Sequence, residues 1–98
     1  MSETIPIASD HAGFDMKQKL VERLRALGYD AQDMGTDSPA STDYADFAHP
    51  VGSRVEHGEA KRGVLLSGTG LGMSYAANRH PHVRAAVAWT PEIAELSR

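Results

Sequence analysis

The sequence predicts an α/β domain built on a mainly parallel sheet. Short apolar runs alternate with segments of helical spacing, and glycines stand just beyond the helical segments. A glycine-rich turn also follows one of the apolar runs. Alternating strands and helices are typical of parallel sheets with right-handed crossovers. The 98 residues fit one domain of ordinary size.

The first half of the chain contains two strand candidates around one helix. Residues 5–9 form a short apolar run, and apolar side chains then recur at helical spacing, with Met16 and Lys17 sharing one position of the pattern. Gly28 is expected to end this helix. A weaker strand is expected over residues 29–34, and a loop follows it.

The next elements are a second helix and a buried strand. The helix is expected over residues 44–56, although Pro50 fits a helix only near its first turn. The side chains expected to face the core are Ala48, Val51 and Val55. Residues 63–67 form a continuous apolar run, as expected for a strand covered on both faces.

The last third of the chain predicts three further elements. A helix through residues 74–78 is expected after the glycine-rich turn, and residues 84–89 are expected to form a fourth strand. Thr90 and Pro91 are typical of a helix start, with a hydroxyl cap followed by proline.

Composition narrows the function classes. The net charge of -3 argues against nucleic-acid binding, which normally requires a basic surface. No apolar run approaches the roughly 20 residues of a membrane span, and the N-terminus lacks signal-peptide features. The absence of cysteine excludes disulfides, thiolate metal sites and a cysteine nucleophile. We therefore expect a soluble, cytoplasmic domain that binds neither nucleic acid nor membranes.

Polar residues follow two of the expected strands. Asp10 and His11 follow the first strand, and Ser67 ends the third. Ligands of parallel sheets bind beyond the carboxyl ends of the strands. A carboxylate beside an imidazole suits sugar hydroxyls and proton transfer near neutral pH. The alternatives are that Asp10 caps the following helix and that Ser67 is an ordinary polar strand end.

The glycine-rich turn over residues 68–72 is the most informative segment. Its backbone amides can approach an anion near a helix N-terminus, so the turn predicts an anion-binding site. The alternative interpretation is a tight turn that binds no ligand. It is not a Walker A loop, because no Gly-Lys-Ser/Thr follows, and it is not a dinucleotide fingerprint, because Met73 stands where the third glycine should be. A serine hydrolase is disfavoured because no Gly-x-Ser-x-Gly elbow surrounds Ser67.

Four histidines and one tyrosine are weaker candidates. His80 and His82 suggest a metal pair, but an exposed loop is favoured because a third ligand is missing. His49 and His57 are interpreted as solvated helix residues. Tyr44 either reaches the strand ends or packs in the domain.

Together these segments resemble the type B ribose-5-phosphate isomerase family, which includes galactose-6-phosphate isomerase subunits. The motifs that carry the resemblance are residues 8–14, 33–36, 41–46, 67–74, 76–78 and 84–86. The resemblance implies a Rossmann-like subunit with helices on both faces of the sheet, and a homodimer or dimer of dimers. It also implies no metal or organic cofactor. The implied reaction isomerises a sugar phosphate, by default ribose 5-phosphate, through a cis-enediolate.

The resemblance also assigns site residues. Asp10 and His11 match the family's substrate-binding pair, and Thr69 matches a threonine that assists ring opening or proton handling. The loop amides are expected to stabilise the enediolate oxygen. The expected catalytic residues are Ser67 and Thr69. The expected substrate-binding residues are Asp10, His11, Tyr44, Gly68, Gly70, Leu71 and Gly72.

The chain departs from the family at the proton-abstracting base. Many members have a cysteine at the position of Ser67, and another branch has a glutamate at the position of Met73. A serine hydroxyl needs an adjacent base. Our hypothesis is that Ser67 acts with help from Asp10 or a histidine, or that it only positions substrate. The alternatives to the pentose reading are a tetrose or hexose phosphate isomerase and a non-catalytic sugar- or nucleotide-binding module.

A second departure concerns the end of the chain. The family continues beyond residues 94–98 with a His-Asn segment and later arginines, which serve ring opening and phosphate binding. The last helix here has room for only about two turns. We therefore expect the single domain, residues 1–98, to lack its C-terminal strand and helix.

Overall fold

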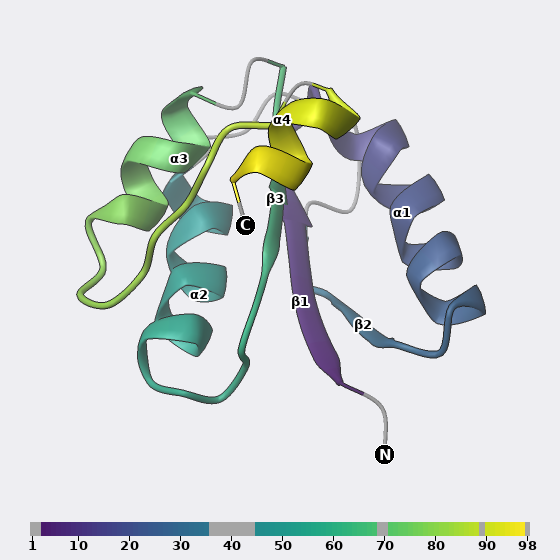
Figure 1. Ribbon diagram of the computed structural model, residues 1–98, viewed down its shortest axis with the longest axis horizontal. Coiled ribbons are helices and arrows are strands. Elements are labelled where there is room, and N and C mark those ends of the chain that lie inside the picture. The colour runs from purple at the N-terminus through teal and green to yellow at the C-terminus, as the bar shows by residue number, and fades with distance from the viewer. Residues whose placement is uncertain (1–2, 36–44, 69–70, 89, 98) are drawn as a thin grey trace.

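A computed structural model describes residues 3–35, 45–68, 71–88 and 90–97. Strands and helices alternate through most of the chain, as predicted. In order, the elements are β1 (Thr4–Ser9), α1 (Phe14–Ala26), β2 (Asp30–Asp33), α2 (Ala45–Glu56), β3 (Val64–Leu66), α3 (Leu71–Asn78) and α4 (Pro91–Leu96). The three strands form one parallel sheet in the order β2-β1-β3. Figure 1 shows α1 on one side of the sheet and α2 and α3 on the other.

The central strand β1 divides the core into two apolar clusters. On one side Ile7 packs with Val21 of α1 and Ala31 of β2. The second cluster joins α2 to α3 and includes Ala48 and Met73. A strand buried on both faces by helices explains why β1 reads as a continuous apolar run rather than an alternating one.

Helix α1 ends where the sequence predicts. Gly28 follows it with a φ of 96°, a left-handed conformation that glycine adopts without strain. The start of the helix is less expected, because the structure buries Lys17 completely and leaves Met16 54% exposed. The periodic pattern located the inward face but did not distinguish these neighbours.

Helix α2 continues through Pro50. The proline lies on the exposed side of the helix, where water can replace the backbone hydrogen bond that proline removes. Ala48 and Val51 are buried as predicted, and Val55 is half-buried. The expectation that Pro50 fits a helix only near its first turn was therefore too strict, because this exposed proline is the sixth residue of α2.

The predicted fourth strand is wrong for the described residues 84–88, which belong to no strand. The side chain of Asn78 takes both backbone groups of Ala85: Asn78 Oδ1 accepts from its N–H at 2.9 Å, and Asn78 Nδ2 donates to its carbonyl at 3.0 Å. A cavity of about 530 Å³, lined by Leu65 and Leu66 among others, lies between β3 and this segment. Trp89 lies outside the described residues.

The last helix begins as predicted. Thr90 Oγ1 accepts a hydrogen bond from the N–H of Ile93 at 3.2 Å, and Pro91 is the first helical residue. Ile93 and Leu96 are 39% and 85% exposed, so α4 buries little of its apolar surface. A helix of this length gains most of its stability from packing, which is small here.

Candidate functional site

Two turns meet at the carboxyl edge of the sheet. Strands β1 and β3 are paired with Ser9 opposite Leu66, so that Asp10 and Ser67 follow directly opposed residues. The N–H of Asp10 donates to the Leu66 carbonyl at 3.1 Å. The structure therefore brings together the two segments that the sequence placed at one edge.

Gly13 allows the first turn to pack directly on β3. A Cβ at this position would lie 2.8 Å from both the carbonyl carbon and the oxygen of Leu66. Such contacts do not occur between real atoms, so only glycine fits. The Gly13 N–H donates to Asp10 Oδ1 at 3.0 Å, and α1 begins at Phe14 with Gly13 as its N-cap residue. Asp10 thus stabilises the turn before α1 without being the N-cap residue.

The predicted site side chains at these turns are accessible. Asp10, His11 and Ser67 are half-buried, and Gly68 is exposed. Leu71 and Gly72 form the start of α3, where backbone N–H groups have no partner within the helix. Tyr44, Thr69 and Gly70 lie outside the described residues.

An ion pair with one fully buried partner, Lys17, joins α1 to the end of β2, where the Asp33 side chain is 32% exposed. Lys17 Nζ lies 2.7 Å from Asp33 Oδ1, with the Lys17 side chain 0% exposed. Partial burial alone would raise the pKa of Asp33, but hydrogen bonds from Lys17 and from the Gly35 N–H outweigh it and lower that pKa. The carboxylate therefore stays charged near neutral pH, and the pair is a true ion pair. The sequence pattern placed Lys17 with Met16 at one position of the helix but did not reveal Asp33 as its partner, because that residue comes from another element.

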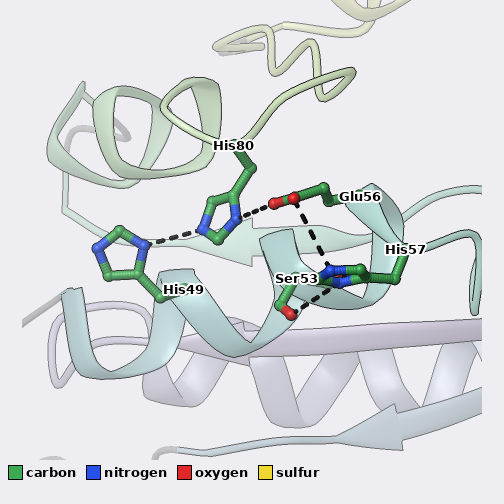
Figure 2. A network of polar contacts seen from close by, with 5 residues as sticks. All are labelled: His49, Ser53, Glu56, His57 and His80. Carbon is green, nitrogen blue, oxygen red and sulfur yellow. Dashed lines mark hydrogen bonds and ion pairs between the residues drawn. The ribbon is translucent and has the colours of Figure 1, made fainter.

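A second polar cluster joins α2 to the end of α3 (Figure 2). His80 Nδ1 lies 2.8 Å from Glu56 Oε1, and His80 Nε2 lies 2.9 Å from His49 Nδ1. A carboxylate only accepts, so His80 donates through Nδ1, and in its neutral form it accepts from the Nδ1–H of His49. His57 contacts Ser53 one turn earlier.

This cluster corrects the expectation of an exposed loop at His80, whose side chain is only 17% exposed. His82 is exposed, as expected. His49 and Glu56 lie two helical turns apart on α2, with Gly52 between them. This spacing was a signal in the sequence for the contact with His80. Among the residues that the structure describes, no three metal-ligating side chains gather into a metal site.

We expect Gly52→Ala to destabilise the protein, although alanine is the better helix former by about 1 kcal/mol. A Cβ at Gly52 would lie 2.7 Å from His80 Cδ2, and the ring is held by hydrogen bonds at both nitrogens. The clash should cost about 1–3 kcal/mol, measured by urea unfolding. In a His80→Ala background the same change should become neutral or stabilising. Equal losses in both backgrounds would contradict this explanation.

The large cavity only partly overlaps the candidate site. Ser67 and Gly68 line it together with Met73, whereas neither Asp10 nor His11 is among its lining residues. The site is thus the edge between the two turns, which the cavity adjoins. Across the described residues, no helix combines the length and apolar character needed to cross a membrane.

Comparison with protein families and sequences identifies close relatives. The family model described as Ribose/Galactose Isomerase matches residues 5–98. The chain is 42% identical over 94 residues to ribose-5-phosphate isomerase B of Escherichia coli, covering 96% of this chain and 63% of that protein. It is 40% identical over 95 residues to a putative sugar phosphate isomerase of Bacillus subtilis, covering 96% and 64%. The chain thus spans just under two thirds of these relatives' length.

Solved structures show the same fold. Ribose 5-phosphate isomerase of Thermotoga maritima has a TM-score of 0.94 at 46% identity, covering all of this chain and 68% of that one. Ribose-5-phosphate isomerase B of Mycoplasma genitalium, with bound ribulose-5-phosphate, has a TM-score of 0.93 at 38% identity, covering 100% and 66%. The family model and the solved Rossmann-like structures both match nearly the whole of this chain. The chain therefore belongs to the ribose/galactose isomerase family.

Proposed function

We propose that this protein interconverts the aldose and ketose forms of a sugar phosphate, with ribose 5-phosphate as the first substrate to test. The observation that carries the proposal is the meeting of the Asp10 turn with the Ser67 turn at the carboxyl edge of a parallel sheet. Named relatives that act on or bind pentose phosphates support this choice of substrate.

Asp10 and His11 are assigned to substrate binding. Both are half-buried, so they can contact a ligand while the surrounding protein restricts their motion. A carboxylate accepts hydrogen bonds from sugar hydroxyls, and a neutral imidazole both donates and accepts. These residues would orient the open-chain sugar across the edge of the sheet.

The glycine-rich turn is assigned to the developing oxyanion. Isomerisation removes a proton beside the carbonyl group and leaves negative charge on the enediolate oxygen. Backbone N–H groups of the turn around Gly68 and of the first turn of α3 can stabilise that charge, and each preorganised donor contributes about 3–4 kcal/mol in comparable sites. Thr69 is assigned to ring opening or proton handling.

Ser67 is the proposed centre of proton transfer. A hydroxyl ionises too weakly to act as a base unaided at neutral pH, so a neighbouring Asp10 or a histidine must assist it. The alternative role is that Ser67 positions the substrate while another group removes the proton. Because a serine replaces a thiol at this position, a non-catalytic sugar- or nucleotide-binding module is the second candidate function.

Solvent exchange separates these functions. The full-length protein is incubated in heavy water with tetrose, pentose and hexose phosphates in turn, and carbon-bound deuterium is measured by NMR. An isomerase introduces deuterium beside the carbonyl group and forms the isomeric sugar, and the reacting member identifies the chain length. Thermal stabilisation by a sugar phosphate without exchange would establish the binding module instead.

The assembly is proposed from the family resemblance, and the location from the composition and the N-terminal sequence. We propose a cytoplasmic homodimer or dimer of dimers that works without a metal or organic cofactor. The proposed partner is therefore the small-molecule substrate together with another copy of the chain.

A further inference from the structure

Lys17 is a fully buried charged side chain that the proposed reaction does not use. It lies near the start of α1, and its Nζ is 2.7 Å from Asp33 Oδ1 and 5.3 Å from the centre of the Phe14 ring. The Asp33 side chain is 32% exposed, so the cost of removing charge from water falls mainly on Lys17, and such a pair is often no more stabilising than apolar residues of the same volume. Stability alone therefore does not account for a charge at this position.

Asp33 connects the ion pair to the backbone before Asp10. The same Oδ1 that binds Lys17 accepts the Gly35 N–H at 3.0 Å. The Gly35 carbonyl accepts the Ser9 N–H at 2.8 Å, and Ser9 immediately precedes Asp10. A continuous series of hydrogen bonds thus runs from the Lys17 ammonium to the strand end that places Asp10.

The backbone of Lys17 holds the other end of the same turn. Its N–H donates to the Gly13 carbonyl at 2.9 Å, and the Gly13 N–H donates to Asp10 Oδ1 at 3.0 Å. The turn that carries Asp10 and His11 is therefore connected to Lys17 on both sides. Only the connection through Asp33 involves the Lys17 side chain, so a shift of that side chain would reach the turn through Asp33 and Gly35.

We propose that Lys17 and Asp33 are positioning residues for Asp10 and His11. The ion pair fixes the geometry of the turn and acts on the substrate only through it. Its effect on catalysis rests on the proposed function, whereas its effect on the turn does not. In enzymes, a misplacement of about 1 Å can cost about 100-fold in rate.

The test uses the double variant Lys17→Met/Asp33→Asn in the full-length protein. It removes both charges together, so no unpaired charge stays buried, and the Asn oxygen can still accept the Gly35 N–H. The matched control is Lys19→Met/Asp30→Asn, which removes an exposed lysine and an exposed aspartate from the same two elements. Lys17→Met alone is the second variant if the double variant does not fold, because the Asp33 charge that it leaves is 32% exposed to water.

Two readouts separate positioning from a general structural role. We expect amide hydrogen exchange at Asp10 and Gly13 to become about tenfold faster relative to Ile5 and Ile7, with an almost unchanged Tm. We also expect KM for the sugar phosphate to rise about 10- to 100-fold, with a smaller change in kcat. The control should change neither quantity.

Unchanged exchange at the turn, or exchange that rises equally throughout β1, would overturn the positioning role. A wild-type protein without isomerase activity would overturn the proposed function instead. In that case the exchange measurement still decides whether the ion pair fixes the turn.

Discussion

Gly13→Ala should lower the free energy of unfolding by about 3 kcal/mol. The added methyl group would lie 2.8 Å from backbone atoms of Leu66, which cannot move away as a flexible side chain can. Relief requires the turn to separate from β3, and this breaks the hydrogen bond from the Asp10 N–H to the Leu66 carbonyl. The turn that presents Asp10 and His11 would shift with it. Urea unfolding and sugar-phosphate binding, measured on the same variant, should therefore both be impaired.

Gly68→Ala is the matched stability control for this prediction. Among the residues that the structure describes, a Cβ at Gly68 would meet only the Ala12 Cβ at 3.5 Å, an ordinary contact distance. We expect its unfolding free energy to stay within about 1 kcal/mol of wild type. Similar losses for both variants would show that the close approach of Gly13 to Leu66 is not the cause.

Ser67→Cys should raise kcat about tenfold or more, because a thiol with a pKa of about 8.5 forms a base far more readily than a hydroxyl. Ser67→Ala should lower kcat about 100- to 10,000-fold if Ser67 takes part in proton transfer. The kcat and KM of each variant are measured from initial rates on the sugar phosphate that exchanges solvent deuterium. The substitutions are small, and Ser67 is half-buried, so the fold should tolerate them.

The pattern of the two constants distinguishes the proposed roles of Ser67. A Ser67→Ala variant with near-full kcat would show that Ser67 takes no part in proton transfer. If that variant has only a raised KM, Ser67 positions the substrate. Ser53→Ala on α2, outside both turns, serves as the control and should leave both constants unchanged. A thiol variant slower than wild type would contradict the assignment of this position to the base.

The features that the sequence predicted correctly depend on local chemistry. The glycine that ends α1 and the threonine that caps α4 act through their own backbone and neighbours, so they can be recognised without knowing the fold. Predicting that the Asp10 turn meets the Ser67 turn required one further rule, that parallel strands end at a common edge of the sheet.

The features that were missed depend on contacts between distant segments. Lys17 is buried because Asp33 arrives from another element, and no periodic pattern records that partner. His80 is largely buried because its ring contacts Glu56 of α2 and packs against Gly52, which has no side chain in the way. Residues 84–88 form no strand, and within them the Asn78 side chain binds both backbone groups of Ala85, a contact from another element that the apolar run does not reveal.

The central position of β1 has a consequence for the order in which the protein forms. This strand lies between β2 and β3 in the sheet but precedes both in the chain, so it is synthesised before either neighbour. The hydrogen bond from Asp10 to Leu66 joins residues with more than half of the chain between them. Such long-range pairing is slow to form. During synthesis the apolar surface of β1 is therefore not fully covered until β3 has emerged, and the edge that carries Asp10 and Ser67 forms only then.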